Sequence, residues 1–211
     1  YYLLIMETRK TPLEADRYYH IYNRGINGQN IFLEEKNYNY FLLKYAQYVS
    51  PMVDTFAYCL LDNHFHLLIK SKTEEEIRTF LNRKKEDKSI SWLLSNAFAS
   101  LFQSYAQAIN KQYSRTGTFF EEPFRRIEVY NDAYFAELIR YIHYNPQKHG
   151  FTNNFRDYPH SSYHSFIADK RTKLAKDQLF NWFGSQQGYI DFHTIQHKHG
   201  LKMNDFIIEY D

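Results

Sequence analysis

Two histidines separated by one hydrophobic residue are the side chains with the clearest capacity for chemistry. His64 and His66 flank Phe65 within the apolar run 62–70. Successive side chains of a β-strand alternate between faces, so both imidazoles would point to one face of a sheet and Phe65 to the other. Two neutral imidazoles at this spacing can bind one divalent ion. The plain alternative is a half-buried strand whose histidines face solvent, and the pair alone leaves both interpretations open.

The residues around this pair predict the first half of a mixed fold. Aromatic and aliphatic runs indicate strands, and apolar positions at helical spacing indicate an amphipathic helix. Asp62 and Asn63 supply a tight turn, so the flanking strands should form a hairpin. In chain order the pattern predicts a strand at 17–23, a glycine-containing loop at 24–28, a helix at 34–49, a strand at 53–61 and the histidine strand at 64–70.

The second half is expected to be mainly helical. Residues 73–88 are polar, and the charge-rich segment 82–88 within them favours a surface loop. The remaining expected elements are a helix at 90–112, an extended segment at 119–130 that is strand-like at 127–130, a helix from 131 or 132 to 144, and helices at 173–183 and 189–199. The third helix should end at 144 because Pro146 disfavours the helical conformation of the residue before it.

One shoulder of that third helix carries polar side chains. Its apolar stripe is Phe135, Leu138, Ile139 and Ile142, the pattern of a helix that packs on a sheet. At roughly 100° per residue, Tyr141 and Asn145 lie one turn apart beside the stripe. The sequence therefore places a phenol next to an amide.

Composition limits the class of protein. The chain has 211 residues, 44% of them hydrophobic, which is enough for one substantial core and excludes a disordered chain. No apolar run approaches the length of a membrane span. The net charge of +2 is weak support for a nucleic-acid partner, whereas 20 tyrosines and 18 phenylalanines would permit base stacking. A single cysteine, Cys59, excludes an intramolecular disulfide and fits a cytoplasmic location. We expect Met6 to be the true start and leave residues 1–5 out of the fold.

Four blocks in order resemble a known family. They are 19–25, the His64–His66 motif, 140–146 and 158–163, and together they are similar to the REP-associated branch of the single-tyrosine HUH transposases. The resemblance implies an α+β fold with a ferredoxin-like or RRM-like antiparallel sheet in β-α-β-β-α-β order. It also implies a metal-dependent enzyme that acts on single-stranded DNA beside a hairpin. We expect an N-terminal extension at 1–16, the catalytic domain at 17–168 and a helical C-terminal extension at 169–211.

The resemblance also implies roles for individual residues. His64 and His66 would bind Mg²⁺ or Mn²⁺, and Tyr141 would be the nucleophile that forms a 5′-phosphotyrosine. Asn145 occupies the position of the third metal ligand, directly or through a water because it is shorter than the glutamine of some relatives. Gln147 is the alternative. An unperturbed phenol has a pKa near 10, so the nucleophile must lose its proton to a base that the sequence does not identify.

DNA contacts and alternatives complete the predictions. Arg24, Arg125 and Arg126 are candidates for phosphate binding, or they are ordinary surface arginines. The expected partner is single-stranded or hairpin DNA, with a homodimer as a further option. His20 is a strand residue or a site residue.

Two rival functions remain open. One is a catalytically silent hairpin-binding protein on the same fold. The other is a metal-dependent hydrolase, for which Asp62 is the nearest carboxylate in sequence. A second metal site at His193 and His197 is also possible in principle, but the spacing lacks an accompanying carboxylate.

Overall fold

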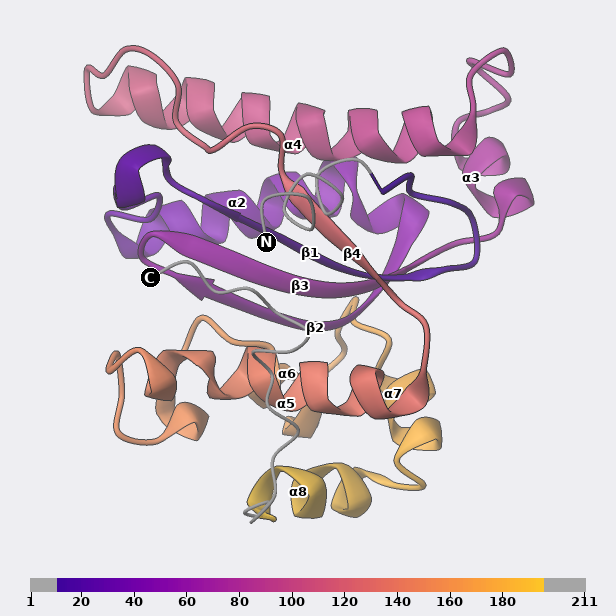
Figure 1. Ribbon diagram of the computed structural model, residues 1–211, viewed down its shortest axis with the longest axis vertical. Helices are drawn as coiled ribbons and strands as arrows, with labels where there is room; N and C mark the ends of the chain where they lie inside the picture. The colour runs from indigo at the N-terminus through magenta and orange to yellow at the C-terminus, as the bar shows by residue number, and fades with distance from the viewer. Residues whose placement is uncertain (1–10, 196–211) are drawn as a thin grey trace.

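The computed structural model describes residues 11–195, which form one antiparallel sheet between two helical layers (Figure 1). The strands are β1 (Tyr18–Arg24), β2 (Val53–Leu61), β3 (His64–Ser71) and β4 (Arg125–Val129). The helices are α2 (Glu35–Tyr48), α3 (Glu74–Phe80), α4 (Ile90–Gln112), α5 (Asp132–Lys148), α6 (Tyr163–Ile167), α7 (Lys176–Trp182) and α8 (Gln186–Thr194). Short 3-10 turns lie at Ile26–Gly28, Ser50–Met52 and Phe155–Asp157.

The sheet confirms the predicted fold class. Its strand order is β2-β3-β1-β4, with β1 antiparallel to both β3 and β4. This order, built from a β-α-β-β-α-β sequence of elements, is that of the ferredoxin-like fold. Within it, His66 lies opposite Tyr22 and His64 lies opposite Arg24. The histidine pair therefore sits at one end of the two central strands.

Each face of the sheet has its own hydrophobic core. Phe65, Leu67 and Ile69 of β3 belong to the core under α2 and α4, whereas Leu68 belongs to the core under α5. Figure 1 shows α2 and α4 on one side of the sheet and α5 to α8 on the other. His64 and His66 share the face of Leu68, because side chains two positions apart point the same way. The predicted alternation is confirmed, and the histidines face α5.

The start of helix α5 lies where the sequence predicts it, after Asn131. The Asn131 side chain accepts a hydrogen bond from the backbone N–H of Tyr134 at 2.8 Å and so caps the helix. The apolar stripe lies wholly in the α5-side core: Phe135, Leu138, Ile139 and Ile142. Burial of this stripe fixes the rotation of α5 about its axis.

The end of α5 corrects the prediction. The helix continues through Pro146 to Lys148 instead of stopping at Tyr144. Proline removes only one backbone donor, and Asn145 and Pro146 are both buried against the sheet side. The backbone N–H of His149 donates to the Asn145 carbonyl at 3.0 Å and closes the last turn. Packing outweighs the local preference, so Asn145 is held within the helix.

Residues 82–88 form the surface loop that the sequence predicts, whereas the helix at the start of the polar stretch 73–88 was not predicted. Residues Glu74–Phe80 form α3, because Thr73 and Glu76 make a capping box. The Thr73 hydroxyl accepts from the Glu76 N–H, and the Glu76 carboxylate accepts from the Thr73 N–H at 3.0 Å. The Thr73 and Glu76 pattern of a capping box was present in the sequence, but the many charged residues around it favoured a loop interpretation.

The last two described helices pack on the α5 side. Leu179 of α7 and Tyr189 of α8 are fully buried in the same core as α5. Helix α8 begins at Gln186 and ends at Thr194, so it starts earlier than expected, and residues 196–199 of the predicted helix lie outside the described residues. The expected boundary at 168 stays a prediction. Among residues 11–195, no helix is long and apolar enough to cross a membrane.

Candidate active site

The histidine pair is brought together with two side chains of α5. The His64 and His66 ring centroids are 5.2 Å apart and nearly perpendicular. Asn145 Oδ1 lies 3.3 Å from His64 Nε2, and the Tyr141 ring centroid lies 5.4 Å from that of His66. The four predicted site residues therefore converge within a single chain, although 81 residues separate His64 from Asn145.

The hydrogen bonds of His64 define where its free lone pair points. Its Nδ1 lies 2.6 Å from Asn63 Oδ1, an acceptor, so Nδ1 carries the ring proton and Nε2 is bare. Nε2 and Asn145 Oδ1 are then two acceptors that face each other. Either a rotation of the amide that points Nδ2 at His64, or a cation held between the two lone pairs, resolves this contact. Asn145 Nδ2 is itself buried with no hydrogen-bond partner within residues 11–195.

Burial sets the charge of both imidazoles. Removal from water lowers the pKa of His64 to about 4, and the positive field of His149 adds to this. The pKa of His66 is also well below its ordinary value, chiefly through burial. Both rings are therefore neutral at pH 7, which is the form that binds metal ions.

The donor set fits an open divalent-metal site. Within the described part of the chain, no group of three histidine, cysteine, aspartate or glutamate side chains is placed to hold a metal. Two imidazoles and one amide oxygen leave coordination positions for water and phosphate oxygens, as Mg²⁺ and Mn²⁺ require. The alternative ligand, Gln147, is turned elsewhere, because its Oε1 accepts from the Phe155 N–H at 3.1 Å.

Tyr141 is a buried phenol beside this set. Only 7% of the residue is exposed, and burial raises the pKa of its hydroxyl, while a hydrogen bond with the Asn145 side chain acts in the opposite direction. Lys148 Nζ lies 5.6 Å from the ring centroid. The hydroxyl is thus protonated at neutral pH, and a positive charge from the last turn of the same helix lies over the ring.

Two of the three predicted DNA-binding arginines gather near the site. Glu121 lies between them, with Arg24 Nε 3.9 Å from Oε1 and Arg125 Nη2 2.8 Å from Oε2. Arg24 is opposite His64 in the sheet and its side chain is 23% exposed, whereas that of Arg125 is only 9% exposed. Arg24 is therefore better placed to meet solvent-borne phosphate.

The third arginine lies on the other face of the sheet. Arg126 pairs with Ile21, whose side chain belongs to the core under α4. Its Nη1 donates to Ser95 Oγ at 2.7 Å, and its guanidinium stacks over Phe124. The structure does not bring Arg126 to the histidine pair.

Three further residues lie at the site: His20, for which the sequence left a site role open, and Lys148 and His149, to which it gave no role. His20 Nε2 is 2.9 Å from His66 Nδ1, and the His149 ring centroid is 5.3 Å from that of His64. Lys148 is the third. The helical spacing after Asn145 could have pointed to Lys148 and His149, but only if α5 was extended past the proline. The sequence left a site role for His20 open, and only the strand register places it beside His66.

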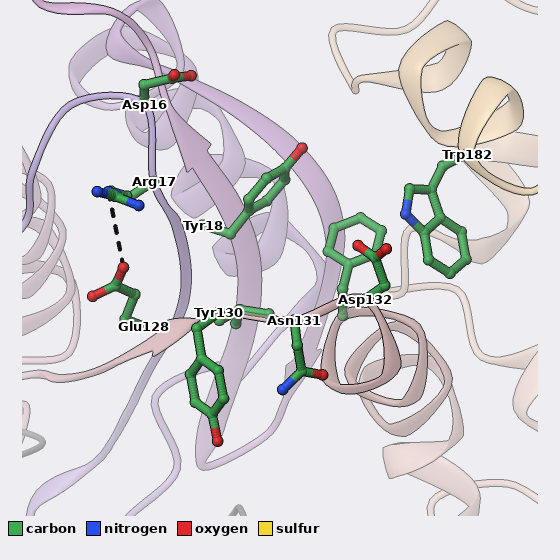
Figure 2. Close-up of a pocket in the computed structure, with 10 residues that line it drawn as sticks. Asp16, Arg17, Tyr18, Glu128, Tyr130, Asn131, Asp132 and Trp182 are labelled. Carbon is green, nitrogen blue, oxygen red and sulfur yellow. Dashed lines mark ion pairs between the residues drawn. The ribbon is translucent and has the colours of Figure 1, made fainter.

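A separate pocket of about 330 Å³ lies at the opposite end of β1. Figure 2 shows its lining, which includes Tyr18, Asp132 and the ion pair between Arg17 and Glu128. Tyr18 begins β1, whereas Arg24, opposite His64, ends it. None of the predicted site residues lines this pocket, and its carboxylates would repel phosphate.

The suggested second metal site is not supported by the contacts of its first histidine. His193 Nε2 lies 2.9 Å from His143 Nδ1, and its Nδ1 lies 2.8 Å from the Tyr189 carbonyl oxygen. Both ring nitrogens are thus engaged in a buried network. His197 lies outside the described residues.

Comparison with known proteins gives consistent results. No family model matches the chain. It is 28% identical over 112 residues to a Haemophilus influenzae protein named as a REP-associated tyrosine transposase, and the match covers 53% of this chain and 59% of that protein. The fold is similar to that of a REP-associated tyrosine transposase solved bound to a REP hairpin, with a TM-score of 0.56, 14% identity, and coverage of 76% of this chain and 84% of the other. Over about half of its length in sequence, and in fold, this chain is similar to proteins named as REP-associated tyrosine transposases.

Proposed function

We propose that the protein cleaves single-stranded DNA beside a hairpin and transfers the strand through a 5′-phosphotyrosine. One observation carries the proposal: the Tyr141 phenol, His64, His66 and Asn145 converge at one end of the sheet. The relative named above is a tyrosine transposase, and the solved neighbour binds a REP hairpin, which supports this class of substrate.

The covalent step follows from the position of Tyr141. Its hydroxyl oxygen bonds to phosphorus and the bond from phosphorus to the 3′ oxygen breaks. The phenolic proton leaves, the departing 3′ oxygen gains a proton, and Tyr141 retains the 5′-phosphate. Because the ester bond is exchanged rather than hydrolysed, the strand can be rejoined elsewhere.

The remaining residues hold and orient the reactants. His64 and His66, with Asn145 directly or through water, would hold Mg²⁺ or Mn²⁺. When bound, the ion would withdraw charge from the phosphate oxygens and so ease attack by the phenol. The Asn145 side chain opposes the rise that burial causes in the pKa of Tyr141. Our candidates for DNA contacts remain Arg24, Arg125 and Arg126. Arg24 is the more exposed of the two arginines near the histidine pair, and Arg126 would contact DNA on the opposite face of the sheet.

Asp62, the carboxylate named for the rival hydrolase, is engaged elsewhere. Asp62 Oδ1 accepts a hydrogen bond from the Tyr38 hydroxyl at 2.7 Å, and Tyr38 belongs to the core under α2. That carboxylate is committed to the other side of the sheet from His66. Strand transfer is therefore the better account of the histidine pair.

The site is assembled within one chain. Tyr141 and His66 are contributed by α5 and β3 of the same copy. A homodimer, if formed, would serve DNA binding rather than complete the chemistry. Genomic DNA as the substrate would place this activity in the cytoplasm.

A covalent-adduct assay tests the proposal. A hairpin oligonucleotide with a single-stranded flank, labelled on its 3′ side, is incubated with the protein and Mg²⁺ or Mn²⁺. We expect a denaturation-resistant protein–DNA adduct, because Tyr141 keeps the labelled fragment. Tyr141→Phe removes only the phenolic oxygen, so it should abolish the adduct while hairpin binding in a gel shift persists.

Two neighbouring tyrosines are matched controls. Tyr134→Phe changes a buried ring of α5 and Tyr144→Phe an exposed one. Both variants should retain the adduct. Free cleaved DNA without an adduct would indicate a hydrolase. Binding without any cleavage in the wild type would indicate the silent hairpin-binding protein.

A further inference from the structure

A fully buried histidine of β1 stands behind His66. His20 has no solvent exposure, and its Nε2 lies 2.9 Å from His66 Nδ1. The two rings stack with centroids 5.1 Å apart and an interplanar angle of 22°. Tyr22 stacks on His20 from the same strand at 4.7 Å. The contact is therefore held by strand pairing and by ring packing.

Only one proton can occupy the bond between the two imidazoles. Both rings are buried, which disfavours their charged forms. Two neutral imidazoles share a hydrogen bond only if one nitrogen donates and the other accepts. The bond thus has two forms, one with the proton on His20 Nε2 and one with it on His66 Nδ1.

The two forms differ at the outer nitrogens. When His20 Nε2 donates, His66 carries no proton on Nδ1 and must carry one on Nε2, which prevents that nitrogen from binding a metal. When His66 Nδ1 donates, His66 Nε2 is bare and His20 carries its proton on Nδ1. His20 Nδ1 is buried and has no hydrogen-bond partner within residues 11–195.

Among buried backbone groups, an N–H without an acceptor is rarer than a carbonyl short of a donor, and the same preference favours the form that leaves His20 Nδ1 bare. The ion-free site therefore favours the form in which His20 donates. Metal binding requires the other form.

We propose that His20 is a positioning residue whose shared proton moves to His66 Nδ1 when a divalent ion binds, so that the two rings exchange tautomers together. The inference rests on the proposed function, because it assigns the ion to His66 Nε2. His20 does not touch DNA or the ion. It fixes the direction of the His66 ring and sets how readily the ion is bound, as partners of metal-binding histidines do.

Two variants separate positioning from packing. His20→Phe keeps an aromatic ring against Tyr22 but offers no acceptor to His66. His20→Gln offers an amide oxygen that accepts from His66 Nδ1 without any tautomer change of its own. In calorimetric titration of the full chain with Mn²⁺, we expect His20→Phe to weaken binding about 10- to 100-fold. His20→Gln should bind at least as tightly as the wild type.

Nitrogen NMR of the wild type gives a readout that a purely structural role would not move. Two-bond proton–nitrogen correlations of His66 should show a proton on Nε2 without Mg²⁺ and on Nδ1 with it. The same tautomer in both states would overturn the proposal, as would wild-type Mn²⁺ affinity in His20→Phe. If the wild type binds no ion at all, the proposed function fails instead, so the two failures are distinguishable.

Discussion

At the scale of single residues, the site owes its character to burial. His64 and His66 are kept neutral by removal from water, and the Tyr141 phenol is kept protonated by the same cause. Neutral imidazoles are ready to bind a cation, whereas a protonated phenol is a poor nucleophile. Burial thus prepares the imidazoles for metal binding, whereas the phenol must still lose its proton when substrate and ion are bound.

Asn145 should couple the ion to the nucleophile, since its side chain contacts both His64 and Tyr141. Asn145→Ala removes an oxygen ligand, so we expect Mn²⁺ affinity to fall about 10- to 100-fold, by calorimetry. Asn145→Asp places a carboxylate at the same position and should bind Mn²⁺ more tightly than the wild type. Equal affinities in all three proteins would show that this side chain is not a ligand.

Lys148 should contact the backbone of bound DNA, because its ammonium is exposed and lies over the Tyr141 ring. Lys148→Met should slow adduct formation and reduce the slope of log affinity against log salt by about 0.7, the value for one single-strand phosphate contact. The matched control is Lys111→Met, which alters an exposed lysine of α4 on the other side of the sheet. A slope that changes equally in both variants would contradict the assignment.

At the scale of elements, α5 is the part that joins the chemistry to the core. Its apolar stripe packs on the sheet, and its last two turns present Asn145 and Lys148 to the histidine strand. Helix α8 supports α5 from behind through the contact between His193 and His143, and His143 Nε2 lies 2.8 Å from Ser162 Oγ. Loss of that network would loosen the helix that carries the nucleophile.

This support should weaken in acid. Burial lowers the pKa of His193 to about 4 in the folded protein, whereas an unfolded histidine titrates near 6.5. Below pH 6.5 the unfolded chain binds a proton that the folded chain does not, so the stability present above that pH is lost as the pH falls toward 4. The limiting slope is about 1.4 kcal/mol per pH unit for one such group.

Urea unfolding at pH 7 and pH 5 measures this effect. His193→Gln keeps hydrogen-bonding groups but does not titrate, so its free energy of unfolding should fall less between the two pH values than that of the wild type. An identical fall in both proteins would assign the acid sensitivity to other buried histidines, of which His20 and His143 have similarly lowered pKa values.

At the scale of the whole molecule, the sheet separates an aromatic core on one face from the candidate site on the other. The core under α2 and α4 is rich in aromatic rings and holds the hairpin that carries the histidines, for example through Phe65 packed on Phe41 and Phe102. The opposite face holds the site and the helices that complete it. Helices cover both faces of the sheet (Figure 1), and the histidine pair lies on the α5 face where β3 begins.

Local sequence determined much of this arrangement. Alternation along residues 64–70 placed His64 and His66 on one face, and the stripe of α5 placed Tyr141 and Asn145 one turn apart, because strand and helix periods are properties of the backbone. The order of elements and the family resemblance then indicated the sheet. These conclusions needed no knowledge of distant contacts.

Tertiary structure decided what local rules could not. His20 meets His66 only through the antiparallel register of β1 and β3, which joins residues 46 positions apart. Register likewise sends Arg125 toward the site and Arg126 to the opposite face. Burial carried α5 past Pro146, against the preference of the local chain. The His20 contact, the opposite faces of the two arginines and the extension of α5 share one physical reason. Packing between segments distant in sequence contributes more free energy than the local conformational preferences of these residues.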